Sequence, residues 1–327
     1  MTDARTAPQT ADLGIWHTPL EPADRLGAAI GLEPGDLWIK RDDWLGLGGG
    51  GSKLRKLARL CAKARADGAT TLVTGGAAQS NHARLTAAAA RRLGFDVTLV
   101  LAAADHDRLG GNLALDGVFG ADVVWTNGPL SGLAAELERV AAEIADRGGR
   151  PAVIPFGGSN VLGAAGYREC AKEILRDAPN VDHVVVPVGS GGTMAGLIAG
   201  LGAERVLGGH SGALADPRAA VAELCGELTG QDIAPDDLRL DEGVAGDGYE
   251  RPTEASLRAM DLAAVNEALV LDPVYGAKAM AALVDAVASS AIATGDRVVF
   301  VATGGLPGLF GHAVADELAA RTAHPRT

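Results

Sequence analysis

The feature that most constrains the fold of this chain is its alternation of short apolar runs with longer helical stretches. Each apolar run is rich in Val, Ile or Leu and is bounded by Gly, Pro or Asp, as is typical of strands. The predicted strands are 37–40, 71–74, 97–101, 122–125, 152–154, 183–187 and 298–302. The predicted helices are 53–66, 81–93, 130–146, 165–177, 192–201, 254–266 and 277–294. Continuously apolar strands that alternate with helices predict parallel sheets covered on both faces.

The spacing of these elements predicts an α/β fold with two lobes, each an open, mostly parallel sheet flanked by helices. Evenly spaced repeats fill residues 54–158, which we predict to be a small domain. Residues 15–53 and 159–327 would form the large domain, with residues 1–14 as an N-terminal tail. Residues 202–250 contain several Gly and Pro breakers and receive no assignment.

Charge and cysteine content exclude several classes of partner. The formal net charge is -12, so nucleic acid and anionic membranes would be repelled. The three cysteines are odd in number, widely spaced and form no CxxC pair, which indicates reduced thiols and no metal site. The first ten residues contain no apolar run and the chain has no uncharged apolar stretch of membrane-spanning length. We therefore expect a cytoplasmic protein.

Glycine, with 45 copies, is about twice as frequent as the usual roughly 7%. The glycines gather where predicted strands meet helices, at 48–51, 75–76, 157–158, 189–192 and 304–305. Open α/β sheets bind ligands beyond the carboxyl ends of their strands, where such turns present free N–H groups. Each turn is therefore a candidate for part of a binding site.

The first turn leads from four glycines, 48–51, into a basic helix that begins with Lys53. The positive end of a helix dipole disfavours a charged lysine, and Schiff-base chemistry requires a neutral amine. Lys53 is therefore a candidate nucleophile, and the alternative is a flexible glycine loop before a basic helix. The turn is not a Walker A loop, because Ser52 precedes the lysine and Leu54 follows it.

The second and third turns carry polar groups at helix starts. Residues 79–82 read Gln-Ser-Asn-His; a helix cap explains one of these polar residues, and ligand binding would explain the run. Residues 189–193 read Gly-Ser-Gly-Gly-Thr after an apolar strand, which suits a phosphate group at a helix N-terminus, with a tight turn as the alternative. The dinucleotide pattern GxGxxG fails, because its last position is Met194.

The last turn follows strand 298–302 with Thr303, whose hydroxyl is suited either to capping or to contacting a ligand ring nitrogen. Tyr249 and Tyr275 lie in loops bounded by glycine, and Tyr275 directly precedes a predicted helix. Each of these tyrosines could be either a packed aromatic side chain or a catalytic hydroxyl.

Taken together, these segments resemble the D-cysteine desulfhydrase and 1-aminocyclopropane-1-carboxylate deaminase family of fold-type-II pyridoxal-phosphate enzymes, a tryptophan-synthase-β-like group. The resemblance covers nearly the whole chain in the same order. It is carried by residues 17–21 (HTPLE), 38–43 (WIKRDD), 50–57 (GGSKLRKL), 79–82 (QSNH), 155–160 (PFGGSN), 166–167 (GY), 189–193 (GSGGT), 272–275 (DPVY) and 303–305 (TGG).

The resemblance implies that the cofactor is pyridoxal 5′-phosphate and that Lys53 is its Schiff-base lysine. Asn81 would hydrogen-bond the 3′ oxygen of the cofactor, and Thr303 would address its pyridine nitrogen. The implied cofactor-binding set is Lys53, Lys56, Asn81, Gly189, Ser190, Gly191, Gly192, Thr193 and Thr303. The implied substrate-binding residues are Ser80, Asn81, His82 and Tyr275, and the implied catalytic residues are Lys53, Ser80, Tyr249 and Tyr275.

Two positions depart from the family pattern. Ser52 stands where the family usually has Asn, which we expect to affect only loop packing. Gly276 stands where the cyclopropane deaminases have a glutamate partner of the ring nitrogen and the desulfhydrases a threonine. A carboxylate there makes the cofactor a strong electron sink, so its absence favours β-elimination over ring opening, and Thr303 is the remaining candidate partner.

The resemblance therefore predicts a lyase that removes a β substituent from a small amino acid and gives pyruvate and ammonia, as a D-cysteine desulfhydrase does. The alternatives are an L-cysteate sulfo-lyase, a biosynthetic enzyme acting on an unusual amino acid, and, less favoured, a cyclopropane deaminase. A different class, a phosphate-binding protein without catalysis, would lack the visible absorbance of a bound cofactor. The family also suggests a homodimer.

Overall fold

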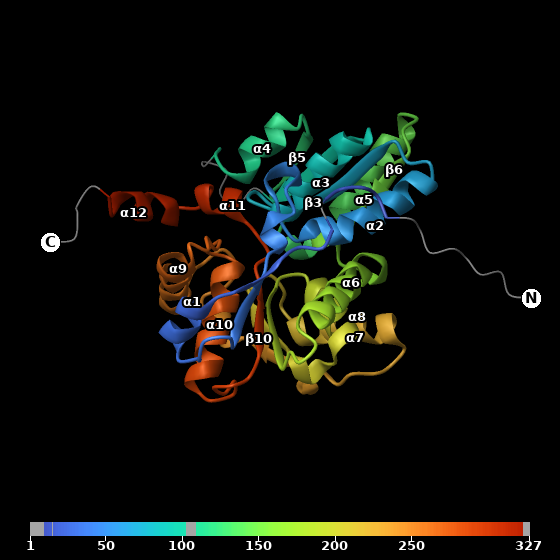
Figure 1. The fold of residues 1–327 in the computed structure, drawn as a ribbon. Helices are drawn as coiled ribbons and strands as arrows, with labels where there is room; N and C mark the ends of the chain where they lie inside the picture. The colour runs from blue at the N-terminus through green and yellow to red at the C-terminus, as the bar shows by residue number, and fades with distance from the viewer. Residues whose placement is uncertain (1–9, 15, 103–108, 323–327) are drawn as a thin grey trace, which may run out of the picture.

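Two open sheets form the framework of the chain, as Figure 1 shows for the computed structural model, which describes residues 10–14, 16–102 and 109–322. The larger sheet has six strands in the order β1-β2-β10-β7-β8-β9, and only the β1–β2 pair is antiparallel. The smaller sheet has four parallel strands in the order β5-β4-β3-β6. The predicted two-lobed, mostly parallel α/β architecture is confirmed.

The strands are β1 (Leu20–Pro22), β2 (Leu37–Lys40), β3 (Thr71–Ala77), β4 (Asp96–Ala102), β5 (Asp122–Thr126), β6 (Pro151–Val153), β7 (His183–Val188), β8 (Val206–His210), β9 (Arg239–Asp241) and β10 (Val298–Val301). The helices are α1 (Asp24–Ile30), α2 (Lys53–Ala66), α3 (Asn81–Leu93), α4 (Asn112–Val118), α5 (Leu133–Asp146), α6 (Val161–Asp177), α7 (Gly192–Leu201), α8 (Pro217–Thr229), α9 (Glu254–Glu267), α10 (Gly276–Ala288), α11 (Leu306–Phe310) and α12 (Val314–Ala320).

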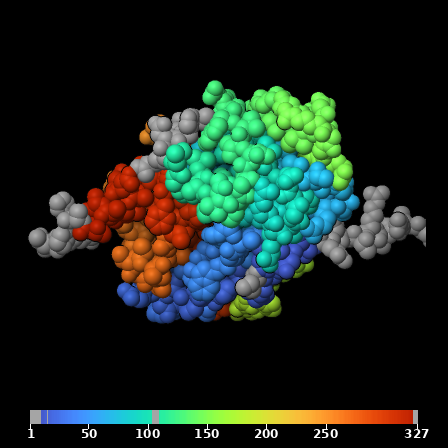
Figure 2. All heavy atoms as spheres, turned by 90° about the horizontal axis from the view of Figure 1, so that it is seen from above, coloured from blue at the N-terminus to red at the C-terminus, as the bar shows by residue number. Residues whose placement is uncertain are grey.

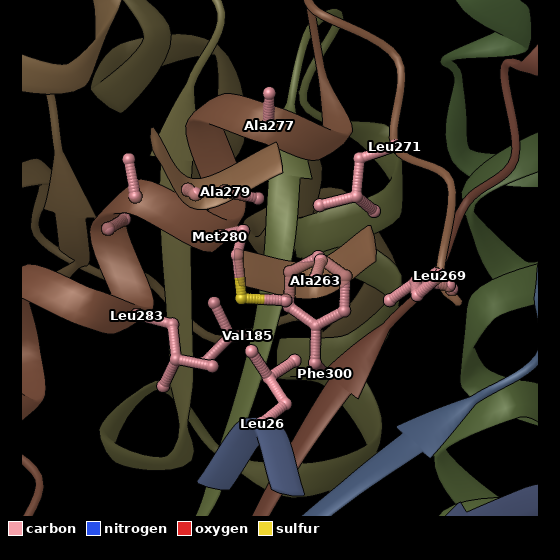
Figure 3. Close-up of a cluster of buried hydrophobic side chains, with 14 of the residues drawn as sticks. Leu26, Val185, Ala263, Leu269, Leu271, Ala277, Ala279, Met280, Leu283 and Phe300 are labelled. Atoms are coloured by element: carbon pink, nitrogen blue, oxygen red, sulfur yellow. The ribbon is translucent and has the colours of Figure 1, made fainter. Parts of the chain in front are cut away.

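Alternation along the central strands divides the core of the larger sheet into two layers. Val298 and Phe300 of β10 face the cluster built with α1, α9 and α10, while Val299 and Val301 face the cluster built with α6, α7 and α8. Figure 3 shows Phe300 packed with Met280 in the first of these layers. Both faces of the sheet are therefore covered, which accounts for the unbroken apolar sequence of its strands.

The helices around the smaller sheet occupy the upper half of Figure 1. Its largest hydrophobic cluster joins the sheet to α2 and α3, and a second, smaller cluster joins it to α5. Figure 2 shows the C-terminal segment, coloured red, beside the orange segment that contains α9. Arg321 at the end of α12 donates to Asp261 of α9 at 2.6 Å, which ties the two together.

Several elements were not predicted from the sequence, and others begin or end at residues that differ from the prediction. Strand β8 lies in the unassigned stretch 202–250 and contains two consecutive glycines. A Cβ at Gly209 would lie 2.6 Å from the Cα of Ala279, so α10 crosses this strand too closely for any side chain. The predicted helix 277–294 is too long, because α10 ends at Ala288. The predicted helix 130–146 is a 3-10 turn followed by α5.

The strands of the smaller sheet fall within residues 71–153, and those of the larger sheet fall on either side of that range. The predicted domain boundaries at 53/54 and 158/159 stay a prediction. Most of the predicted tail 1–14, and all but one of the ten residues assessed for a signal peptide, lie outside the described residues. Within the described ranges no helix is both long and apolar enough to span a bilayer. Cys61, Cys170 and Cys225 are buried and unpaired.

Candidate active site

Turns that follow the carboxyl ends of β3, β7 and β10 meet the start of α2 around one cavity. The cavity therefore lies where open parallel sheets usually bind their ligands. It is lined by Gly51, Ser52, Lys53, Asn81, Arg84, Leu85, Pro187, Gly189, Ser190, Gly191, Thr193, Asp272, Tyr275, Thr303, Gly304 and Gly305. The structure thus brings together most of the cofactor-binding residues that were predicted from separate turns.

The glycine loop that precedes Lys53 is tightly packed. A Cβ at Gly50 would lie 2.5 Å from the carbonyl oxygen of Asp43, and Gly50 has a φ of +79°, so no other residue fits there without strain. Ser52 at the end of the loop donates its N–H to the carbonyl of Thr303 at 3.0 Å. The loop therefore holds the first residue of α2 at a fixed place in the cavity.

Lys53 has a pKa lowered to about 8, chiefly because its surroundings exclude water. The nearby carboxylate of Asp272 opposes this shift and the guanidinium of Arg84 adds to it. The Nζ atom lies 5.8 Å from the ring centroid of Tyr275. At neutral pH a usable fraction of this amine is therefore unprotonated, as attack on an aldehyde requires.

At the start of α7 the N-cap residue, Gly191, supplies no side-chain hydrogen bond of its own, and the first helical N–H, that of Gly192, is bound by a residue outside the helix. Behind the 189–193 loop the hydroxyl of Ser159 accepts hydrogen bonds from Lys56 Nζ at 2.9 Å and from the N–H of Gly192 at 3.2 Å, and lies 2.7 Å from Ser190 Oγ. Ser159 was missing from the predicted site residues, because only its place behind the loop reveals it.

Lys56 is fully buried, and its hydrogen-bond acceptors are Ser159 and the carbonyl of Gly157, at 3.2 Å. Burial, with a smaller effect from Lys53, holds its pKa well below the ordinary value. The Lys56 amine and the N–H groups at the start of α7 supply hydrogen-bond donors, and the negative charge of a phosphate placed against them would favour the protonated form of Lys56. The donors present therefore fit the phosphate of pyridoxal phosphate.

Ser80, Asn81 and His82, the residues of the second turn that were predicted to bind a ligand, lie in different surroundings. Asn81 lines the cavity. Ser80 caps α3, and its hydroxyl accepts the N–H of Ala83 at 3.1 Å. His82 is buried beside Thr74, with 3.0 Å between its Nε2 and the threonine hydroxyl, and burial together with the nearby lysines lowers its pKa to about 3. Ser80 and His82 are not among the lining residues, and their predicted roles stay predictions.

Tyr275 at the start of α10 lines the same cavity as Lys53, while Tyr249 lines a second cavity that shares Asn81, Asp272 and Tyr275 with the first. Burial raises the pKa of both tyrosines above the ordinary value. Lys278, one turn into α10, donates to the carbonyls of Ser211, Ala245 and Gly248 at 2.8 to 3.0 Å. This lysine fixes the loop that carries Tyr249.

Asp272 and Arg84 line the cavity, although neither was predicted to have a role there. Asp272 carries the only carboxylate among the lining residues that the structure describes; it accepts the N–H groups of Tyr275 and Gly276 at 3.0 and 2.9 Å, and burial raises its pKa. Arg84 is buried and donates to the carbonyl of Gly50 at 3.0 Å. With Lys53 and Arg84 against Asp272, the lining is suited to an anion. The described residues contain no cluster of His, Cys, Asp and Glu side chains that could hold a metal ion.

Comparisons with known proteins agree with this geometry. Residues 11–304 match the family described as pyridoxal-phosphate dependent enzyme. A D-cysteine desulfhydrase of Klebsiella pneumoniae is 40% identical over 324 residues, covering 90% of this chain and 93% of the relative. The D-cysteine desulfhydrase of Salmonella schwarzengrund is 39% identical over 310 residues, with the same coverage, 90% and 93%.

Comparison with solved structures shows that the fold is shared with pyridoxal-phosphate enzymes of known structure. A crystal structure described as an ACC deaminase homologue has a TM-score of 0.83 at 32% identity and covers 95% of this chain and 96% of its own. Maize serine racemase, at 18% identity, has a TM-score of 0.65 and covers 94% of this chain and 92% of its own, which shows a shared fold. The predicted cofactor and the predicted enzyme class, a lyase that catalyses β-elimination, are confirmed. The chain belongs to the pyridoxal-phosphate dependent enzyme family.

Proposed function

We propose that this enzyme converts D-cysteine and water into pyruvate, ammonia and hydrogen sulfide, with Lys53 as the residue that binds the cofactor covalently. The observation that carries the proposal is the amine of Lys53, with its pKa near 8, between a phosphate-binding turn and the paired tyrosines. The relatives at 38% to 40% identity that are named D-cysteine desulfhydrase support this choice of substrate.

Pyridoxal phosphate supplies an electron-accepting ring that weakens the Cα–H bond of an attached amino acid. The residues of this chain then hold and move protons. Lys53 would be the base that takes the proton from Cα, in its neutral form. The electron pair of that bond forms the Cα–Cβ double bond while the Cβ–S bond breaks and the sulfur leaves with the electrons of that bond.

We assign the hydroxyls of Tyr249 and Tyr275 to the sulfur leaving group. Burial keeps both phenols protonated at physiological pH, so they act as donors and not as bases. Because one hydroxyl donates to the other over 2.5 Å, one proton of the pair stays available for the substrate. Protonation of the departing sulfur would prevent its return to the β carbon.

The proposed phosphate site consists of Gly189, Ser190, Gly191, Gly192 and Thr193, with Lys56 behind them. The N–H groups at the start of α7 and the Ser159 hydroxyl that joins Lys56 to this loop support it. Asn81 and Thr303 both line the cavity and are proposed to contact the ring oxygen and the ring nitrogen of the cofactor.

Gly276 supports elimination over cyclopropane ring opening. Its N–H donates to Asp272 and it has no side chain that can reach the ring nitrogen. Without a carboxylate partner there, the cofactor stabilises a carbanion less strongly, and loss of a good leaving group demands less stabilisation than ring opening. L-cysteate and less common β-substituted amino acids remain the alternative substrates.

A panel of substrates tests the proposal. Purified protein loaded with pyridoxal phosphate should release pyruvate and sulfide in equal amounts from D-cysteine, and Lys53→Ala should lose both this activity and the visible absorbance of the bound cofactor. If the enzyme released pyruvate from L-cysteate and none from D-cysteine, its activity would be that of an L-cysteate sulfo-lyase. A wild-type protein that stays colourless with pyridoxal phosphate would overturn the catalytic role of Lys53.

We further propose a homodimer that acts in the cytoplasm. Exposed apolar side chains on α11, Leu306 at 47% and Phe310 at 64%, support contact with a second copy. The buried, unpaired cysteines suit a reducing compartment. Light scattering on the purified enzyme should give twice the mass of one chain, and Phe310→Asp should lower it.

A further inference from the structure

Asn112, the first residue of α4, is fully buried and joins three groups beside the cofactor cavity. Its Oδ1 accepts from Arg84 Nε at 2.6 Å, and its Nδ2 donates to the carbonyl of Gln79 at 2.8 Å and to Asn81 Oδ1 at 3.0 Å. Its N–H donates to Gln79 Oε1 at 2.9 Å. We call these four residues, Gln79, Asn81, Arg84 and Asn112, the amide relay.

The chemistry of the partners fixes both amide orientations. A guanidinium has only donors, so the atom of Asn112 that faces Arg84 must be its oxygen. A backbone carbonyl only accepts, so the atom that faces Gln79 must be the nitrogen of Asn112, and that nitrogen also meets Asn81. The atom of Asn81 turned to the relay is therefore its oxygen, which receives a second donor from Arg84 Nη2 at 3.4 Å.

Helix α11 closes the relay from the other side. A Cβ at Gly308 would lie 3.3 Å from Asn112 Nδ2, and one at Gly311 would lie 2.1 Å from Gln79 Oε1. Gln79 also donates from its Nε2 to the carbonyl of Gly110 at 3.0 Å. These contacts hold the side chains of Asn112 and Gln79 in place.

We infer that Asn112 is a positioning residue that turns the Nδ2 donor of Asn81 into the cofactor cavity. This inference rests on the proposed function, in which Asn81 contacts the ring oxygen of pyridoxal phosphate. An N–H donor stabilises the anionic form of that oxygen, whereas a carbonyl oxygen in its place would repel it. The relay thus sets the protonation of the bound cofactor without touching it.

The substitution Asn112→Asp tests the direction of the relay. A carboxylate accepts from Arg84 but cannot donate, so Asn81 must turn its Nδ2 toward residue 112 and present its oxygen to the cofactor. We expect the apparent pKa of the holoenzyme's visible absorbance band to rise by about one unit, equivalent to about a tenfold loss of stabilisation. The rate of cofactor release on dilution should rise by about tenfold as well. Asn112→Ala, which leaves Asn81 with Arg84 alone, should give a smaller shift of the same sign.

Two further variants separate the possible outcomes. Leu113→Ala disturbs the packing of α4 and not the relay, and should leave the pKa of the band unchanged; an equal shift would overturn the inference as mere loosening of α4. Asn81→Ala should shift the band, and if it does not, the proposed contact of Asn81 is wrong. If Asn81→Ala shifts the band while Asn112→Asp and Asn112→Ala do not, the relay is refuted and the proposed function stands.

Discussion

The hydroxyl oxygens of Tyr249 and Tyr275 lie 2.5 Å apart, within one hydrogen bond, where the cofactor cavity joins the second cavity. Their rings meet edge to face, with centroids 6.0 Å apart. Tyr275 is anchored at the start of α10, and Tyr249 belongs to a loop held by Lys278. The pair therefore joins the loop that carries Tyr249 and the start of α10 into one donor group.

Removing either hydroxyl should slow the enzyme without releasing the cofactor. We expect Tyr275→Phe and Tyr249→Phe each to lower kcat with D-cysteine by about 10²-fold, within the range found for positioned proton donors. The double variant should be little worse than the single ones, because the two hydroxyls act as a unit. Steady-state pyruvate release, with the visible absorbance of the cofactor as the control for binding, measures this.

The lowered pKa of Lys53 predicts how cofactor capture depends on pH. The neutral amine attacks the aldehyde, and its fraction rises as the pH increases through the pKa of about 8. The rate of capture by the apoenzyme should therefore rise about tenfold between pH 7 and pH 9 and then level off. A lysine with an ordinary pKa would give about a hundredfold rise with no plateau below pH 10, and stopped-flow absorbance after mixing with pyridoxal phosphate tells the two apart.

The sequence could predict those parts of the site that follow directly from a strand ending in glycines. Lys53, Asn81, Thr193 and Thr303 occupy such turns, and each of them lines the cavity. Ser159 could not be assigned in this way, because its role comes from contacts with Lys56 and the α7 loop across the fold.

Arg84 and Asp272 were not predicted as site residues for a related reason. Arg84 lies one turn into an Ala-rich helix, and only the approach of the glycine loop and of α4 makes its guanidinium part of the site. Asp272 reads as a turn residue before a proline, and its place beside Lys53 depends on how α10 packs. Strand β8 was missed because its glycines, which normally mark turns, are here required by the crossing of α10.

A carboxylate introduced at Gly276 should destabilise the fold. A Cβ at this position would lie 3.3 Å from Asp272 Oδ1, and burial already raises the pKa of that carboxyl. A second negative charge would raise the pKa of Asp272 further. Repulsion between the two carboxylates lowers the stability of the fold at pH values above that raised pKa, and this loss disappears as the pH falls and Asp272 is protonated. The melting temperature of Gly276→Glu should therefore lie further below that of Gly276→Gln at pH 8 than at pH 5. Equal differences at the two pH values would contradict this account.

Replacing Lys278 should destabilise the loop that carries Tyr249 and leave cofactor binding unchanged. Lys278→Met keeps the apolar stem but leaves the carbonyls of Ser211, Ala245 and Gly248 without this donor. We expect the free energy of unfolding in urea to fall by about 3 kcal/mol, with a lower kcat and an unchanged cofactor absorbance. Lys172→Met is the matched control, because Lys172 is exposed and pairs only with Glu169 on the same helix among the described residues; its unfolding free energy should change by less than about 0.5 kcal/mol.

The buried ion pairs of Arg55, near the start of α2, should contribute strongly to the stability of the fold. Arg55 donates to both oxygens of Asp42 at 2.8 Å and to both oxygens of Glu173 at 2.8 Å. Burial alone would raise the pKa of Glu173, but Arg55 and Lys40 hold it at about 2. Asp42→Asn removes one of the two carboxylates that pair with Arg55, the fully buried one, and leaves Glu173 as the remaining counter-ion. Because one counter-ion remains, we expect a loss of stability toward the lower end of the about 3–5 kcal/mol that breaking a buried ion pair costs.

Urea unfolding of Asp42→Asn at pH 7 measures that cost. Glu143→Gln provides the comparison, because Glu143 pairs with Arg139 on the exposed face of α5, where ion pairs contribute about 0–1 kcal/mol. Because the pKa of Glu173 is depressed, its contribution is present above its unfolded value, near pH 4.5, and is lost as the pH falls toward 2. The stability difference between wild type and Glu173→Gln should accordingly shrink on acidification from pH 6. A difference that stays constant down to pH 3 would mean that the ion pairs of Glu173 contribute nothing beyond its packing, and that α2 is held in place by the apolar contacts of its other face.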